Sequence, residues 1–118
     1  MYKNIKIAII EDDENLRFLT AHRLESEEYF VVQTGDGNKA VEMVLEHQPD
    51  IVLLDWMLPG KQGPEICEEL RKEHGYNGLI IMLTAKAQDV DKIDAYSFGV
   101  SDYLTKPFNP EELLEIVK

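Results

Sequence analysis

The stretch IVLLDWMLPG, residues 51–60, decides the fold of this chain. Its first four residues are all aliphatic, which predicts a short strand that is buried on both faces of a sheet. Asp55 ends this strand, and Pro59-Gly60 breaks the chain soon afterwards. An unpaired carboxylate at the end of an apolar strand is energetically costly. The stretch therefore predicts a buried strand with a chemically important carboxyl end.

Apolar runs and amphipathic segments alternate on both sides of this stretch. Further strands are predicted at residues 5–10 (IKIAII), 29–34 (YFVVQT), 79–83 (LIIML) and 102–105 (DYLT). Helical spacing is found in Leu16, Leu19, Thr20 and Leu24, in Ala40, Val41, Val44 and Leu45, in Ile66, Cys67 and Leu70, more weakly in residues 89–98, and from Pro110 onward. Five strands alternating with five helices predict a doubly wound α/β fold with a parallel sheet and helices on both faces.

Composition and charge limit the possible functions. The chain has 118 residues, which suits a single domain over residues 1–118. Its net charge of -11 argues against direct binding to a nucleic-acid backbone or an anionic membrane. A single cysteine and no signal-peptide pattern lead us to expect a cytoplasmic protein. Because the sequence stops within an amphipathic helix, we expect a truncation before a further effector domain.

Polar side chains follow four of the predicted strands, where ligands bind in open α/β sheets. They are Glu11, Asp12, Asp55, Thr84 and Lys106, and we expect them to converge on one edge. Three adjacent carboxylates repel one another unless a cation joins them, and oxygen ligands suit Mg²⁺. A lysine and a hydroxyl beside such an ion would hold phosphoryl oxygens. The remaining carboxylate would then be a nucleophile that forms an aspartyl-phosphate.

Four motifs, IIEDD, LLDWMLPGKQG, MLTA and DYLTKPF, resemble in order and spacing the motif set of the response-regulator receiver (CheY-like) family. The resemblance covers essentially the whole chain. It implies a sheet in the order 2-1-3-4-5 and a sensor histidine kinase as partner. It also implies a signalling domain rather than an enzyme, one that catalyses only its own phosphorylation and dephosphorylation.

The resemblance assigns a role to each residue of the acidic edge. Asp55 would be the phospho-acceptor and a ligand of Mg²⁺. Asp12 would bind the ion directly, Glu11 would act largely through water, and the backbone carbonyl of Met57 would complete the protein ligands.

The resemblance also implies the residues that hold and sense the phosphoryl group. Thr84 and Lys106 would each bond a phosphoryl oxygen, and Tyr103 would be the switch aromatic that turns inward when Thr84 moves. The peptide bond from Lys106 to Pro107 would be cis, a form that is accessible before proline. Hydrolysis of the phosphorylated form would be controlled at Met57 and Lys86, and these side chains lead us to expect a long-lived phosphorylated form.

The sequence supports two interpretations of what the domain controls after phosphorylation. The stretches PGKQG and DYLTKPFNPEELL are similar to those of winged-helix, OmpR/PhoB-like transcription regulators, which dimerise through the fourth helix, fifth strand and fifth helix. On that dimer face Lys92 and Asp102 fit the pattern, whereas Asp94, Ser97 and Ser101 depart from it. We therefore expect a homodimer on phosphorylation, with DNA bound only through a missing effector domain. A stand-alone receiver or phosphorelay adaptor remains the alternative.

Two other functional classes are disfavoured. Aspartyl-phosphate phosphatases of this fold typically carry a second aspartate two positions after the nucleophile, where this chain has Met57, which cannot transfer protons. A flavin or nucleotide binder would need a glycine- or hydroxyl-rich loop after the first strand. The acidic residues 11–14 would instead repel phosphate there.

Overall fold

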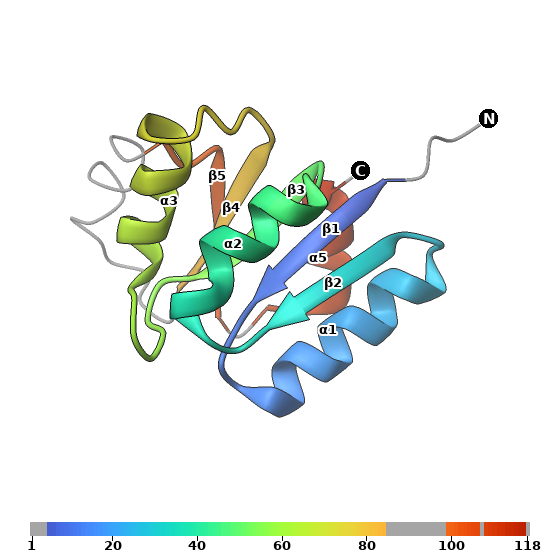
Figure 1. Ribbon diagram of the computed structural model, residues 1–118. Coiled ribbons are helices and arrows are strands. Elements are labelled where there is room, and N and C mark those ends of the chain that lie inside the picture. Colours follow the sequence, from blue (N-terminus) through green and yellow to red (C-terminus); the bar gives the residue numbers. More distant parts are fainter. Residues whose placement is uncertain (1–4, 85–98, 107, 118) are drawn as a thin grey trace.

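The computed structural model of the protein describes residues 5–84, 99–106 and 108–117 (Figure 1). A parallel sheet of five strands forms its middle layer, in the order β2-β1-β3-β4-β5. The strands are β1 (Lys6–Ile10), β2 (Phe30–Thr34), β3 (Ile51–Asp55), β4 (Leu79–Thr84) and β5 (Asp102–Thr105). The predicted doubly wound fold and its strand order are confirmed.

Helices cover both faces of the sheet (Figure 1). Within the described residues they are α1 (Glu14–Ser26), α2 (Gly37–His47), α3 (Gly63–Lys72) and α5 (Pro110–Val117). Helices α2 and α3 pack on one face, and α1 and α5 pack on the other. The predicted helix at residues 89–98, together with Lys86, Lys92, Asp94, Ser97 and Pro107, lies outside the described residues.

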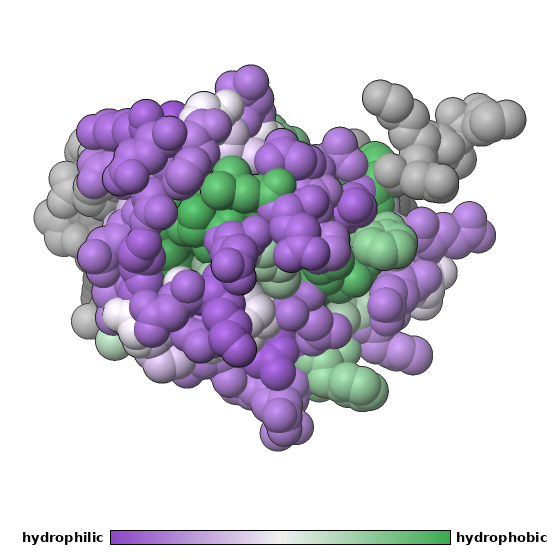
Figure 2. Space-filling view, in the orientation of Figure 1, coloured by the Kyte–Doolittle hydropathy of each residue, from purple (hydrophilic) through white to green (hydrophobic). Residues whose placement is uncertain are grey.

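The two faces of the sheet carry two separate cores, because successive strand residues point to opposite sides. Ala8 and Val52 join the core under α2 and α3, whereas Ile7 and Leu53 join the core under α1 and α5. Hydrophilic side chains cover most of the face seen in Figure 2, and apolar surface shows between α2 and α3. No helix of the described residues is long and apolar enough to cross a membrane.

Two local features differ from the sequence pattern. Strand β2 lies at the sheet edge and is only half buried. Its Phe30 side chain is 57% exposed, and the Lys6 ammonium lies 5.2 Å from the centroid of the Phe30 ring. In α1, Leu19 was predicted to face the core but is 64% exposed, and Ala21 is buried instead. Thr20 and Leu24 of the predicted stripe are buried, Leu16 is half-buried, and only Leu19 faces solvent.

The helices that follow β1 and β2 begin with aspartate caps. Asp13 Oδ1 accepts a hydrogen bond from the Leu16 amide at 3.1 Å, and Asp36 Oδ1 accepts one from the Asn38 amide at 2.8 Å. Such caps satisfy amides that the first helical turn leaves unpaired. The Asp13 side chain therefore caps α1, whereas its neighbours Glu11 and Asp12 do not.

Candidate functional site

Three of the predicted site residues meet at the carboxyl end of the sheet. Glu11 follows β1, Asp55 ends β3, and Lys106 follows β5. The Lys106 ammonium lies 2.6 Å from Glu11 Oε1 and 3.1 Å from Asp55 Oδ1. The two carboxylates are almost inaccessible, at 1% exposed for Glu11 and 5% for Asp55. The expected convergence is thus confirmed for a buried pair of carboxylates and one cation.

The Glu11 side chain is fixed at both of its oxygens. Its Oε2 accepts a hydrogen bond from the Asp13 amide at 3.0 Å. Its Oε1 faces the Lys106 ammonium as an ion pair, but among the described residues it has no hydrogen bond of good geometry. A fully buried carboxylate oxygen without an aligned donor is well suited to bind a cation.

Asp12 adds a third carboxylate at the solvent side of the site. Side-chain oxygens of Glu11, Asp12 and Asp55 all lie within 4.8 Å of one another, with Asp12 exposed and the other two buried. An all-oxygen donor set that is partly open to water suits Mg²⁺, which retains several water ligands. Together with the buried Glu11 oxygen, this donor set fits the ion that the sequence predicts.

The environment changes the protonation of Asp55 and of Lys106. Burial and, next to it, the neighbouring Glu11 carboxylate raise the pKa of the Asp55 carboxyl, Lys106 opposes both effects, and the net pKa is about 7. Burial disfavours the charged form of Lys106, but its contacts with Glu11 and Asp55 outweigh this and raise its pKa. Lys106 therefore remains a cation, and a cation beside Asp55 favours the ionised, nucleophilic carboxylate.

Thr84 lies on β4, the strand next to the Asp55 strand, and Tyr103 lies on β5, one strand further out. Thr84 ends β4, is half-buried, and accepts a hydrogen bond at its carbonyl from the Lys106 amide at 2.6 Å. Tyr103 is half-buried on β5 and packs against the core under α2 and α3. Their placement on neighbouring strands is compatible with the switch pair that the resemblance implies.

The loop after Asp55 is held by close backbone contacts that sequence reasoning missed. The Trp56 amide donates to the Leu83 carbonyl at 2.9 Å, and the Gly63 amide donates to the Trp56 carbonyl at 2.9 Å. A Cβ atom on Gly63 would lie 2.3 Å from the Asp55 carbonyl oxygen. Gly63 is therefore required where α3 begins against the acceptor. In the sequence, the glycine that ends PGKQG is the only sign of a special backbone position here, and it does not show that the Asp55 carbonyl lies against it.

The remaining predicted residues lie apart from this cluster. Met57 is 67% exposed, two positions after the acceptor, and Asp102 is exposed at the opposite end of β5. Lys92 is outside the described residues. Cys67 is fully buried, and burial raises the pKa of its thiol to about 11, so it behaves as the small apolar side chain that the helical spacing predicted.

A five-stranded parallel sheet in the order 2-1-3-4-5, with buried acidic groups and a lysine at its carboxyl edge, defines the receiver class of α/β proteins. The sequence profile of the response regulator receiver domain matches residues 7–118. The chain therefore belongs to the response-regulator receiver family, and the family that its motifs resemble is confirmed.

Solved structures of receivers from several bacteria are similar to this chain. The BeF₃-activated N-terminal receiver domain of Klebsiella pneumoniae RstA is 38% identical, with a TM-score of 0.88, over 95% of this chain and 94% of that one. The receiver domain of the Pseudomonas aeruginosa sensor histidine kinase PA1611, solved with magnesium in its active-site cleft, is 33% identical, with a TM-score of 0.87, over 98% and 95%. Vibrio cholerae CheY4 is 28% identical, with a TM-score of 0.91, over 98% and 97%.

Proposed function

We propose that this domain receives a phosphoryl group from a sensor histidine kinase on Asp55 and signals by changing conformation. The observation that carries the proposal is the Lys106 ammonium, which lies 3.1 Å from Asp55 Oδ1 and 2.6 Å from the buried Glu11 carboxylate. Membership of the receiver family supports the same role. Asp55→Asn tests the acceptor, because it removes the anionic oxygen that would attack phosphorus.

The transfer requires an ionised carboxylate and positive charge around the phosphoryl oxygens. An Asp55 carboxylate oxygen attacks phosphorus, an O–P bond forms, and the N–P bond of the phosphohistidine donor breaks, so that the imidazole leaves with the bonding electrons and a proton from water. Lys106 donates to a phosphoryl oxygen, and the Thr84 hydroxyl donates to another. The Lys106 ammonium lies 3.1 Å from Asp55 Oδ1, and Thr84 ends β4, the strand next to β3, which supports an arrangement that needs little reorganisation.

We propose Mg²⁺ as the cofactor, held by Asp12, Asp55, the Met57 carbonyl and, largely through water, Glu11. The ion would supply positive charge that offsets repulsion between the acidic site and the phosphoryl oxygens. The three adjacent carboxylates and the buried Glu11 oxygen support this assignment. The magnesium in the cleft of the PA1611 receiver supports it as well.

Asp12→Ala is expected to weaken Mg²⁺ binding by at least about 10-fold, because a carboxylate is removed from the ion-binding cluster. Asp13→Ala is the matched control, since Asp13 is the next carboxylate along but caps α1. It should lose about 1 kcal/mol of stability and keep its magnesium affinity. The measurement is a Mg²⁺ titration followed by Trp56 fluorescence. Equal weakening by the two substitutions would contradict the proposed ligand set.

We further propose that Met57 contributes to a long-lived phosphorylated form. Hydrolysis needs a water in line with the phosphorus, and the thioether of Met57 cannot hold that water by a strong hydrogen bond. Its side chain is 67% exposed, so it stands where water reaches the acceptor loop. Lys86, the other position that the resemblance implicates, is outside the described residues.

Met57→Asn is expected to shorten the phosphorylated lifetime by about fivefold, because one hydrogen bond to the attacking water is worth about 1 kcal/mol. Phosphate release is measured from purified phosphorylated protein with Mg²⁺ and without kinase. Met57→Leu is the control, since it keeps an apolar side chain and should release phosphate at the wild-type rate. Unchanged or slower release from Met57→Asn would show that position 57 does not control the water.

We propose that the output is transcriptional and is exerted by a phosphorylation-dependent homodimer, with DNA bound by a separate effector domain in the cytoplasm. The motif similarity to winged-helix regulators supports this role, as does the 38% identity to the N-terminal receiver domain of RstA. Asp102 is exposed on edge strand β5, where a partner can reach it. Light scattering with and without beryllofluoride and Mg²⁺ tests this proposal, and a monomer in both conditions would favour the stand-alone or adaptor role.

A further inference from the structure

We propose that Arg17 is a positioning residue that holds the acidic loop, residues 11–13, in the arrangement that binds Mg²⁺. The inference rests on the proposed function, because it concerns the affinity of the same site. Arg17 was not predicted as a site residue, and its own side chain does not need to touch the ion.

The Arg17 guanidinium joins three parts of the fold. Arg17 lies in the first half of α1, yet its Nη1 donates to the Glu11 carbonyl oxygen at 2.8 Å. Its Nε donates to Gln33 Oε1, on edge strand β2, at 3.2 Å. One planar group with several donors in fixed directions can make both contacts at once. The loop after β1 is thereby tied to β2 through a side chain as well as through the backbone.

Gly35 provides the space for this contact. A Cβ atom at Gly35 would lie 2.4 Å from Arg17 Nη1, 3.3 Å from the Glu11 carbonyl oxygen and 3.4 Å from Arg17 Cζ. The guanidinium therefore lies against the bare backbone of residue 35, and the largest clash of an added methyl group is with the guanidinium. The φ angle of Gly35 is not among the positive ones of the described glycines. Alanine therefore fits the backbone there, and its methyl group has to move the end of the flexible arginine. Gly35→Ala thus displaces the Arg17 guanidinium while keeping its charge.

The contact matters because the Glu11 carbonyl belongs to the peptide that leads into Asp12. The Glu11 amide donates to the Thr34 carbonyl at 3.1 Å, and the Arg17 contact fixes the carbonyl on the other side of the same residue. The directions of the Glu11 and Asp12 side chains follow from the orientation of these peptides. Groups that orient metal ligands from outside typically change metal affinity by about 10- to 100-fold when removed.

Charge and positioning make opposite predictions for Arg17. A guanidinium near a dication repels it, so removal of the charge alone would tighten Mg²⁺ binding. Loss of the hydrogen bond to the Glu11 carbonyl would release the loop and weaken binding. We expect positioning to dominate, because Arg17 is only half-buried and water screens its charge, whereas its contact with the loop is direct.

The experiment is a Mg²⁺ titration of the whole chain, followed by Trp56 fluorescence, for wild type, Arg17→Met, Gly35→Ala and the double variant. We expect Arg17→Met to weaken binding by about 10-fold and Gly35→Ala to weaken it by a smaller factor in the same direction. The double variant should bind at most slightly more weakly than Arg17→Met, because the main clash of Gly35→Ala is with Arg17 and only its 3.3 Å contact with the Glu11 carbonyl oxygen remains.

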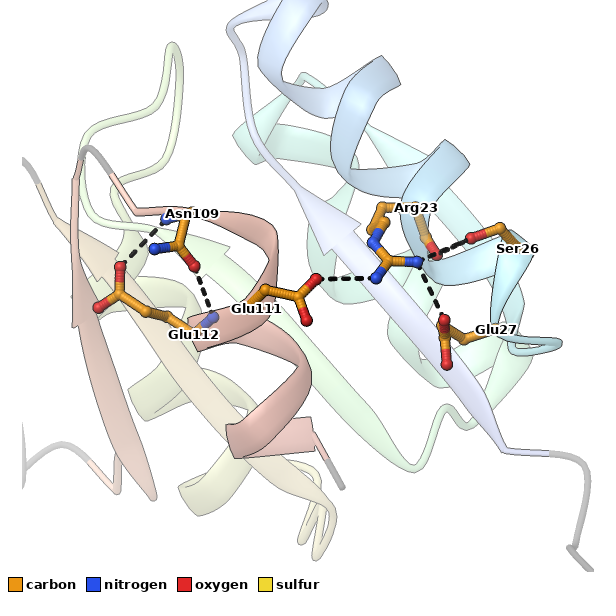
Figure 3. Close-up of polar contacts among 6 residues, drawn as sticks. All are labelled: Arg23, Ser26, Glu27, Asn109, Glu111 and Glu112. Carbon is orange, nitrogen blue, oxygen red and sulfur yellow. Dashed lines mark hydrogen bonds and ion pairs between the residues drawn. The ribbon is translucent and has the colours of Figure 1, made fainter.

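Arg23→Met is the matched control on the same helix. Figure 3 shows that Arg23 points toward α5 and pairs with Glu27 at 2.9 Å and with Glu111 at 2.8 Å. Its removal takes away the same charge and a similar volume from α1 but touches no residue of the acidic loop, so Mg²⁺ affinity should remain at the wild-type value. Thermal unfolding of each variant in chelator shows whether it is folded, and Gly35→Ala provides the test if Arg17→Met is not.

The outcomes separate this inference from the proposed function. If wild type shows no Mg²⁺ binding, the proposed cofactor is wrong and the inference falls with it. If wild type binds Mg²⁺ but Arg17→Met binds equally or more tightly, only the positioning role is wrong. Additive effects of Arg17→Met and Gly35→Ala would also contradict it, since Gly35 would then act on the loop without Arg17.

Discussion

Asp55→Asn is expected to take up no phosphoryl group from a small phosphodonor in Mg²⁺, whereas wild type should gain the mass of one group. The amide lacks the anionic oxygen that attacks phosphorus, so the loss should be complete at the level that intact-mass spectrometry detects. The substitution keeps the size and shape of a buried side chain that is 5% exposed, so the fold should be retained.

The control for this experiment is Asp102→Asn. Asp102 is a carboxylate at the other end of the strands, exposed at the start of β5. It should be labelled like wild type, because nothing places it near the acidic edge. If Asp55→Asn were labelled to the wild-type extent, another residue would be the acceptor. Peptide mapping of the labelled product would then identify it.

Lys106→Met is expected to lower the free energy of unfolding by about 2 kcal/mol at pH 8 in chelator, because it leaves two buried carboxylates without their cation. The loss should be smaller at pH 5. The pKa of Asp55 is already raised to about 7 and should rise further without Lys106. A carboxyl with a raised folded pKa stabilises the fold at low pH, and this contribution disappears as pH rises from about 4 through the folded pKa.

The lysine itself stays charged across this range, because its pKa is raised above the ordinary value, so the pH dependence between 5 and 8 reports the carboxyls. The measurement is urea unfolding of wild type and Lys106→Met at both pH values. Lys72→Met is the control, since Lys72 pairs with Glu68 in an exposed i,i+4 contact. It should change stability by less than about 0.5 kcal/mol at either pH. An equal loss at pH 5 and pH 8 for Lys106→Met would show that packing, rather than charge, explains the effect.

The order of strands and helices was predictable because it depends on short-range patterns. The aliphatic run that ends in Asp55 was assigned to residues 51–55, and the structure gives β3 the same bounds. The face of α3 formed by Ile66, Cys67 and Leu70 was also predicted and is buried. Periodicity failed in α1, where Leu19 faces solvent, because sequence spacing alone does not show which of two overlapping apolar stripes the sheet will cover.

The sequence predicts which residues form the candidate site, because parallel strands bring their carboxyl ends to one edge of the sheet. Glu11, Asp55 and Lys106 follow three such strands, and they meet there. Their roles as acceptor, metal ligand and phosphate-binding group came from the family motifs and remain predictions. The residues of the fourth helix remain predictions too, since they lie outside the described part of the chain.

By itself, the sequence determined the fold class, the family and the polar residues that share one edge, since each of these depends on residue type and on position along a strand. Only the tertiary structure decided which side chains touch. It showed that Lys106 lies between Glu11 and Asp55, that Gly63 admits the acceptor backbone, and that Arg17 reaches the Glu11 carbonyl across Gly35. The Lys106 contacts join segments distant in sequence, and all of these distances depend on how the helices pack on a twisted sheet, which no local pattern encodes.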